Sequence, residues 1–328
     1  MKALLSREQG GPEKLRIEDV PEPTAGASEL LVRIRACSIN FPDVLIIEDK
    51  YQLKPPRPFA PGGEFAGEVI GVGNGVTEWQ IGDRLIAATG FGGLVEQTVI
   101  PARSAFRLPA ERSFEEGSAL LLTYATAIHA LVDRGRLQSG QALLVLGAGG
   151  GVGIAAVEIG KALGARVIAA VSSQAKAQAA RDAGADAAVI YPADAGDPKA
   201  LSELFKDSVG SAGADVILDP VGGPYSEAAL RSISWEGRFL VVGFPAGIAK
   251  LPLNLTLLKS CDVCGVFWGA FAARDPKANA AHVEQLFRWW DEGKIAPRIS
   301  ATFPLKQAGE AIAALRDRKA VGKLVVTL

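Results

Sequence analysis

A glycine-rich stretch between an apolar strand and a helix constrains this fold more than any other feature of the sequence. Residues 147–153 read GAGGGVG, between the apolar run 142–146 and the helix-like segment 152–163. Glycines let backbone N–H groups approach a ligand closely, and a helix that begins at the end of the loop directs its positive dipole end at that ligand. This order predicts a dinucleotide-binding domain whose loop holds a diphosphate. The Lys-Ser/Thr pair of a nucleoside-triphosphate loop is missing, which argues against phosphoryl transfer.

Strand-like and helix-like segments alternate from about residue 123 onward. The apolar strand candidates lie at 142–146, 166–171, 187–190, 215–219, 238–243 and 262–267. Continuous apolar strands with helices between them predict a parallel, doubly wound sheet. The helix-like segments HVEQLFRWWDEGK and AGEAIAALRDR and the strand KLVVTL follow, and we expect this tail to return to the first domain.

The N-terminal third of the chain predicts a different, β-rich domain. Within residues 30–37, one face carries Val32, Ile34 and Ala36 and the other carries Arg33, Arg35 and Cys37, which is the period of a half-buried strand. Further strand candidates at 15–20, 67–72 and 84–88 are separated by Gly- and Pro-rich turns. Together these segments indicate a compact, mostly antiparallel domain.

Composition excludes several kinds of partner. The 328 residues include 48% hydrophobic residues, enough for a large core, and their 35 Lys and Arg nearly balance 36 Asp and Glu. With no basic run, we expect neither nucleic acid nor an anionic membrane as the main partner. The first residues lack the apolar stretch of a signal peptide, and no segment is long and apolar enough to cross a membrane, so we expect a cytoplasmic protein that acts on a small molecule.

The few cysteines and histidines favour neither disulfides nor metal. Cys261 and Cys264 form a CxxC pair, but the second pair that structural zinc requires is absent from the sequence. His129 and His282 both lie in helical patterns, and we interpret them as packed or surface residues. We predict no metal site.

The residues that follow the predicted strand 166–171, the second of the dinucleotide-binding domain, indicate the cofactor. NAD-binding domains commonly place an Asp or Glu there, on the adenosine ribose. This sequence has Ser172 and Ser173 instead, followed by Lys176. Without the carboxylate, a ribose 2′-phosphate is not repelled, and hydroxyls with one cation can bind it. The pattern favours NADPH.

Several motifs connect the sequence to a known family. They are ACSINFPDVL at 36–45, PGGEFAGEVIGVGNGV at 61–76, GDRL at 82–85, GQALLVLGAGGGVGIAAVEIGK at 140–161, GAD at 184–186, DPVGG at 219–223, GRFLVVGF at 237–244 and GK at 322–323. In this combination the sequence resembles the zinc-free quinone oxidoreductase (ζ-crystallin-like) branch of the medium-chain dehydrogenase/reductase superfamily. One departure is Glu158, where this branch usually has Gln.

The resemblance implies an α/β fold in three segments. These are a GroES-like β-rich catalytic domain over 1–122, a Rossmann domain with a doubly wound parallel sheet for NADPH over 123–265, and a segment over 266–328 that returns to the catalytic domain. It also implies a homodimer, with a tetramer as the alternative, in which the sixth strand of the cofactor sheet pairs across a twofold axis.

The resemblance further implies hydride transfer without a metal. Zinc alcohol dehydrogenases of this superfamily have a Cys ligand where this sequence has Asn40, and the His of a G-H-E motif where it has Gly63. Without a Lewis acid, the acceptor is expected to be a conjugated system: a quinone, or alternatively an enone or enoyl thioester. A non-catalytic NADPH-binding protein is a further alternative. For a CoA thioester, Lys50, Lys54 and Arg57 are the candidate phosphate contacts.

Particular site residues follow from the resemblance. Asn40, Asp43 and Tyr51 match positions that line the nicotinamide and substrate pocket, although Asp43 also suits a helix cap and Tyr51 also suits packing. The positions matching cofactor contacts of the family are Asn40, Thr126, Gly150, Gly151, Val152, Ser172, Lys176, Tyr191, Gly243, Phe244 and Lys323. Trp268 either lines the cleft from the sixth strand of the cofactor sheet or lies in the core. No residue stands out as the proton donor, so water and Tyr51 remain open.

Overall fold

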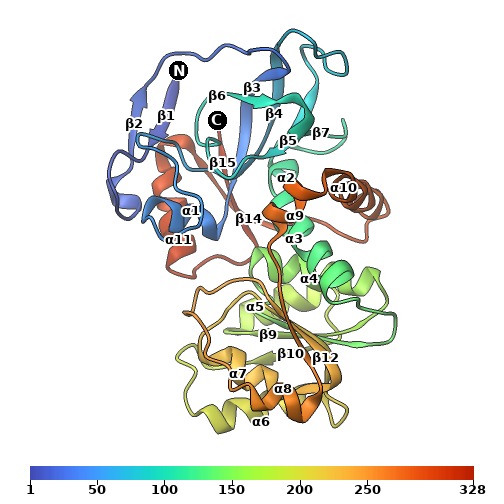
Figure 1. Ribbon diagram of the computed structural model, residues 1–328. Helices are drawn as coiled ribbons and strands as arrows, with labels where there is room; N and C mark the ends of the chain where they lie inside the picture. The colour runs from blue at the N-terminus through green and yellow to red at the C-terminus, as the bar shows by residue number, and fades with distance from the viewer. The chain divides into compact units, whose positions relative to one another are not determined.

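The computed structural model describes residues 1–328, which divide into two compact units (Figure 1). The first unit comprises Met1–Leu122 and Pro297–Leu328, and the second comprises Thr123–Ala296. The chain thus returns to the first unit at Pro297, whereas the sequence analysis placed the return at 266. The reason is that α9 (Trp268–Arg274) and α10 (Pro276–Asp291) pack within the second unit.

The second unit is built on a six-stranded parallel sheet with the strand order β10-β9-β8-β11-β12-β13. The strands are β8 (Ala142–Leu146), β9 (Arg166–Val171), β10 (Ala187–Ile190), β11 (Ala214–Asp219), β12 (Ile233–Val241) and β13 (Asp262–Gly265). All six lie within or overlap the predicted strand segments. The strand order reverses beside β8, which is the arrangement of a doubly wound sheet and confirms the predicted fold class.

The central strands of this sheet form the core of the second unit. Every residue of β8 is buried, because α4 (Gly151–Ala162) packs on it. Gly160 of α4 permits the close approach: a Cβ there would lie 2.7 Å from Leu143 Cδ2. The remaining helices that pack on the sheet or on each other include α5 (Gln174–Asp182), α6 (Pro198–Val209), α7 (Pro224–Leu230) and α8 (Asn254–Lys259).

The first unit is β-rich, as the sequence predicts, with a seven-stranded sheet whose central strand is β3 (Glu29–Ile39). This long strand pairs antiparallel with three others, β4 (Glu64–Val72), β6 (Gln97–Pro101) and β15 (Lys323–Thr327). The sheet is completed by β5 (Arg84–Ala88), β7 (Ala105–Arg107) and β14 (Ile299–Pro304). Only the pair β14 and β15 is parallel, so the expectation of a mostly antiparallel domain is met.

Short helices and a separate hairpin complete the first unit. Strands β1 (Lys2–Leu5) and β2 (Arg16–Asp19) pair with each other, while α1 (Phe41–Ile47) and α11 (Ala308–Arg316) contact each other. β15 enters the middle of this core with Leu324 and Val326 buried. Across the whole chain, no helix combines the length and the apolar character that crossing a membrane requires.

Candidate functional site

The glycine loop, residues Gly147–Gly153, lies at the carboxyl end of β8, where open α/β sheets bind ligands. Gly150 is the N-cap of α4 and Gly151 its first residue. The first N–H groups of a helix have no partner inside the helix, and they carry the positive end of its dipole. The loop therefore has the N–H groups and the dipole that suit an anion, and Gly150, Gly151 and Val152 stay predicted cofactor contacts.

Close packing explains two of the loop's glycines. A Cβ on Gly153 would lie 2.2 Å from the backbone oxygen of Gly147, and one on Gly149 would lie 2.6 Å from Lys176 Cβ. A Cβ on Gly150, by contrast, would meet only the Gly147 oxygen at 3.5 Å. Gly153 is thus required by the fold, whereas the space beside Gly150 is open to a ligand.

Ser172 and Lys176 come together beside this loop. Lys176 Nζ donates to Ser172 Oγ at 3.3 Å, and the Ser173 hydroxyl accepts from the Lys176 N–H as the N-cap of α5. The stem of Lys176 lies against Gly149. No carboxylate ends β9, so the local charge suits a phosphate.

The other predicted cofactor contacts of this unit lie in varied surroundings. Tyr191 follows β10 and is buried against the rings of Phe205 and Tyr225. Gly243 and Phe244 follow β12 at the carboxyl edge of the sheet, as the glycine loop follows β8, and Phe244 is 45% exposed. Thr126 lies in the short helix α3 (Thr126–Ile128).

Trp268 does not lie on the sixth strand. It begins α9, is half-buried, and its indole N–H donates to Asn279 Oδ1 of α10 at 2.8 Å. The indole therefore joins α9 to α10.

In the first unit, Asn40 and Lys323 meet in a buried polar cluster, the Asn40 cluster, formed with Ser38 and Glu64. Lys323 Nζ donates to Asn40 Oδ1 at 2.6 Å and to Glu64 Oε1 at 2.8 Å. Asn40 Nδ2 donates to Glu64 Oε1 at 3.0 Å and lies 3.3 Å from the Ser38 carbonyl oxygen. The orientation of the Asn40 amide is therefore fixed by an ion pair whose side chains are 4% and 1% exposed.

Glu64 is the residue of this cluster that the sequence analysis missed. Its Oε1 also accepts from the Ser38 hydroxyl at 2.6 Å, and its Oε2 accepts from the Leu122 N–H at 2.7 Å. The only signal in the sequence was a carboxylate in the GGEF stretch, at the start of a strand-like run.

Asp43 is a helix cap in this structure. Its Oδ2 accepts from the Asn40 N–H at 2.7 Å, forming a capping box at the start of α1, and its Oδ1 accepts from the Gly62 N–H at 2.9 Å. Burial raises the pKa of this carboxyl to about 6, against the lowering effect of the two N–H groups. Asp43 thus joins the start of α1 to the segment before β4.

Tyr51 lies near Asp43 and is half-buried against the core of the first unit. Burial, and secondly the negative charge of Asp43, raise the pKa of its hydroxyl. The structure therefore brings Asn40, Asp43, Tyr51 and Lys323 into one region of the first unit.

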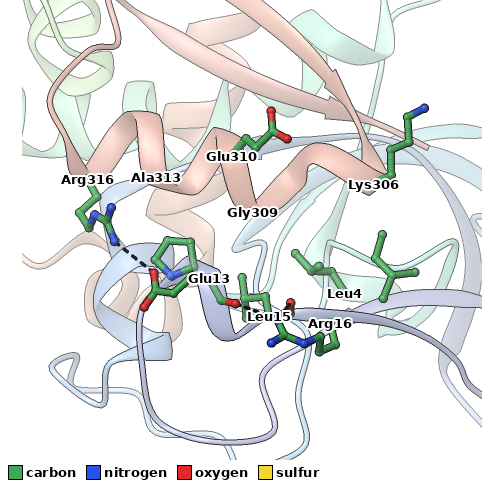
Figure 2. Close-up of a pocket in the computed structure, with 11 residues that line it drawn as sticks. Leu4, Glu13, Leu15, Arg16, Lys306, Gly309, Glu310, Ala313 and Arg316 are labelled. Atoms are coloured by element: carbon green, nitrogen blue, oxygen red, sulfur yellow. Dashed lines mark hydrogen bonds and ion pairs between the residues drawn. The ribbon is translucent and has the colours of Figure 1, made fainter.

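A shallow groove of about 550 Å³ also lies in this unit, between η1 (Pro12–Lys14) and α11 (Figure 2). Charged side chains follow its rims, and Arg316 pairs with Glu13 across it at 3.4 Å. Arg16 Nη1 is likewise engaged, by the backbone oxygens of Glu13 and Leu15. None of the predicted site residues lines this groove, so we do not assign the site to it.

Both histidines belong to one cluster in the second unit. His129 Nδ1 lies 2.6 Å from Asp133 Oδ2, His282 Nε2 lies 3.4 Å from Asp133 Oδ1, and the His129 ring stacks on Phe271. This is packing of the kind expected from the sequence. No three His, Cys, Asp or Glu side chains are arranged to hold a metal ion.

Glu158, the departure from the family pattern, is buried in α4. Its Oε2 accepts from the Tyr124 hydroxyl at 2.6 Å and from the Ala296 N–H at 3.1 Å. Burial raises the pKa of this carboxyl from 4.5 to about 7, despite those two donors. The acid therefore remains protonated in the folded state at pH values where the unfolded chain has already lost the proton.

We expect Glu158→Gln to stabilise the protein increasingly as pH rises. In the wild type the raised pKa makes the contribution of Glu158 to stability greatest below pH 4.5, and this contribution, up to about 3 kcal/mol, is lost as pH rises to about 7. The glutamine of the variant does not titrate, so the difference in unfolding free energy between the two proteins should grow from pH 4.5 to 7 and then level off. Urea unfolding at pH values across this range measures it, and a difference independent of pH would contradict the expectation. Other buried carboxyls are common to both proteins and cancel.

Comparisons with known proteins agree with both units. Residues 26–110 match the alcohol dehydrogenase GroES-like domain family, and residues 151–285 match the family described as zinc-binding dehydrogenase. The chain is 36% identical over 330 residues to the quinone oxidoreductase-like protein 2 homolog of Nematostella vectensis, covering 99% of this chain and 88% of that protein.

Two solved structures extend the comparison. Mycobacterial Rv1454c complexed with NADPH is 29% identical with a TM-score of 0.92, and the match covers 100% of both chains. The CurK enoyl reductase is 25% identical with a TM-score of 0.87, covering 99% of this chain and 98% of that one.

A GroES-like unit joined to a Rossmann unit with a glycine loop defines a medium-chain dehydrogenase/reductase, a class of oxidoreductases. Within that superfamily, the chain belongs to the quinone oxidoreductase-like family.

Proposed function

We propose that this protein is an NADPH-dependent quinone reductase that transfers hydride without a metal ion. The observation that carries the proposal is the contact between Lys323 Nζ and Asn40 Oδ1 at 2.6 Å. It places a fixed ammonium on the one side-chain oxygen that Asn40 has, at the position where zinc-dependent members have a ligand. Gly63, at the second ligand position, has no side chain. These residues do not fit a catalytic zinc ion.

The Rossmann unit fits NADPH. The N-terminal amides of α4 suit the diphosphate, and Ser172 with Lys176 suits the 2′-phosphate. Gly243 and Phe244 are proposed to lie near the nicotinamide. When bound, NADPH supplies the hydride, and the relative solved with NADPH supports this choice of cofactor.

The first unit is proposed to bind the acceptor. A quinone or enone oxygen gains negative charge as hydride adds to the conjugated system, and nearby donors stabilise that charge. Tyr51 has a hydroxyl for this purpose. Asn40 is held in one orientation by Lys323 and Glu64, and Asp43 fixes the start of α1 that carries Asn40 as its cap.

A CoA thioester is less well supported as the acceptor. Of the three candidate phosphate contacts, Lys50 pairs with Glu48 at 2.7 Å and Arg57 pairs with Asp49 at 2.8 Å. These ion pairs largely neutralise the positive charges of Lys50 and Arg57. The structural similarity to an enoyl reductase nevertheless keeps α,β-unsaturated carbonyl and enoyl thioester substrates as the second candidate.

The direct test follows NADPH oxidation by absorbance with a panel of quinones, enones and enoyl-CoA thioesters, each with and without a chelator. Fastest turnover on quinones, unaffected by chelator, would support the proposal. Preference for an enoyl thioester would favour the second candidate, and binding without turnover on any acceptor would favour a non-catalytic NADPH-binding protein.

We expect Ser172→Asp to reverse the cofactor preference. A carboxylate at this position repels the 2′-phosphate and pairs with Lys176, so the Kd for NADPH should rise about tenfold or more while that for NADH does not. Ser211→Asp, an exposed position in the same unit, makes the same change in net charge and is the control. Cofactor titration by fluorescence measures both, and an unchanged ratio of the two Kd values would remove Ser172 from the 2′-phosphate site.

We also propose that two copies pair through the edge of the Rossmann sheet. β13 is an edge strand, and the segment before it exposes large apolar side chains: Ile248, Leu253, Leu257 and Leu258 are between 64% and 81% exposed. Such a patch on an edge requires cover. Leu257→Asp is expected to shift the protein toward the monomer in sedimentation velocity, whereas Ile81→Asp, at an apolar residue 69% exposed in the other unit, should leave the dimer intact. A monomeric wild type would contradict the proposal.

A further inference from the structure

Asp219 is a buried carboxylate at the end of β11 whose hydrogen-bond partners are all uncharged. Its Oδ1 accepts from the N–H groups of Val221 and Gly222, both at 2.8 Å, and its Oδ2 accepts from the Ser226 hydroxyl. The residue is 2% exposed, and burial raises the pKa of its carboxyl. A buried charge without a counter-ion costs free energy. A gain in stability therefore does not explain an aspartate at this position. Its role is better inferred from the segment that its hydrogen bonds hold in place.

Asp219 holds the loop Pro220–Gly223, and this loop is bonded to the one that follows β12. The Val221 carbonyl oxygen accepts from the Ala246 N–H at 2.8 Å, and the Gly223 N–H donates to the Gly247 carbonyl oxygen at 2.7 Å. The two loops therefore keep their positions together.

Contact between these loops is close at Gly222. A Cβ on Gly222 would lie 2.5 Å from the Gly247 oxygen and 3.0 Å from Phe244 Cα. The backbone oxygen of Asp219 in turn accepts from the Val242 N–H at 2.9 Å. Asp219 thus fixes the backbone path of residues 243–247 through the loop Pro220–Gly223.

The same loop also touches the glycine loop. A Cβ on Gly147 would lie 2.8 Å from Val221 Cγ2. Asp219 is therefore placed where the loops after β8, β11 and β12 meet, at the carboxyl edge of the sheet that binds ligands in this class of fold.

We propose that Asp219 is a positioning residue for the nicotinamide half of the cofactor. By holding the loop Pro220–Gly223 it sets the course of the segment 243–247, whereas the adenosine half depends on Ser172 and Lys176. This inference rests on the proposed function, because it takes NADPH as the ligand.

The test compares Asp219→Ala with Asp219→Asn by calorimetric titration of two ligands, NADPH and 2′,5′-ADP, which lacks the nicotinamide. The alanine variant should weaken NADPH about tenfold or more and 2′,5′-ADP by less than about threefold. The asparagine variant retains an oxygen that can accept from Val221 and Gly222, so it should bind both ligands nearly as the wild type does. Equal losses for the two ligands in the alanine variant would overturn the inference.

A second pair of variants tests the inference without touching the buried charge. Gly222 and Gly210 both have positive φ values, +76° and +86°, so alanine strains the backbone at each. Only at Gly222 does the new Cβ press on residues 243–247, while at Gly210 no atom lies within 4 Å. Gly222→Ala should therefore weaken NADPH selectively, and Gly210→Ala should not; equal NADPH affinities would contradict the inference. If the wild type binds neither ligand, the proposed function fails instead.

Discussion

Replacing Lys323 with Met is expected to lower the unfolding free energy of the GroES-like unit by about 3–5 kcal/mol, because a buried carboxylate then loses its only cation. Glu64 and Lys323 are 1% and 4% exposed and lie 2.8 Å apart. The carboxylate would keep only the neutral donors Ser38, Asn40 and Leu122. Scanning calorimetry of the cofactor-free protein would show the loss as a drop of roughly 10 °C in the Tm of that unit.

Two further variants separate charge from packing. In Glu64→Gln combined with Lys323→Met, no charge remains buried in the Asn40 cluster, so the double variant should recover to within about 2 kcal/mol of the wild type. Lys319→Met removes a lysine whose side chain is 74% exposed and should cost less than about 0.5 kcal/mol. A double variant no more stable than Lys323→Met alone would show that the ion pair is not the source of the loss.

The Asn40 cluster connects this stability to the proposed chemistry. Its ammonium fixes the amide oxygen of Asn40, and its carboxylate accepts from the amide nitrogen. A buried ion pair is a costly way to hold a sheet together, since apolar residues of similar volume often do as well. It does, however, give one unique orientation to the side chain that the resemblance places at the substrate.

Much of the Rossmann unit could be predicted because its signals are local. An apolar run such as 142–146 predicts a strand buried on both faces, and the glycines that follow predict a turn into a helix. The structure gives β8 and α4 at these places. The choice of Ser172 and Lys176 as neighbours followed from the same short-range logic, and they do meet.

The rest depends on contacts between residues far apart in the sequence. Glu64 and Lys323 are separated by 259 positions, so no window of sequence shows that one compensates the other. The residue at which the chain returns to the first unit could likewise not be predicted from the sequence. The sequence of residues 266–296 does not indicate which unit its helices pack in, because an amphipathic helix such as α10 indicates only that one face is buried.

Gly153→Ala is expected to abolish measurable NADPH binding and to destabilise the Rossmann unit as well. The new Cβ would lie 2.2 Å from the Gly147 oxygen and 2.6 Å from Ala148 Cα, and both are backbone atoms that cannot rotate away. The loop must therefore move off the start of α4. We expect NADPH affinity to fall by about 100-fold or more and the unfolding free energy by about 1–3 kcal/mol.

Gly150→Ala distinguishes loss of the ligand site from loss of the fold. Its Cβ would meet only the Gly147 oxygen, at 3.5 Å, so the unit should unfold at nearly the wild-type temperature. The methyl group would nevertheless stand at the N-cap of α4, where the diphosphate must approach the backbone, so NADPH binding should still be lost. Gly269→Ala, in α9, where the nearest atom to the new Cβ would be Phe267 Cε2 at 3.8 Å, controls for the general effect of the substitution. Wild-type NADPH affinity in Gly150→Ala would mean that the diphosphate is held elsewhere, because a ligand on these amides has no room for that methyl group.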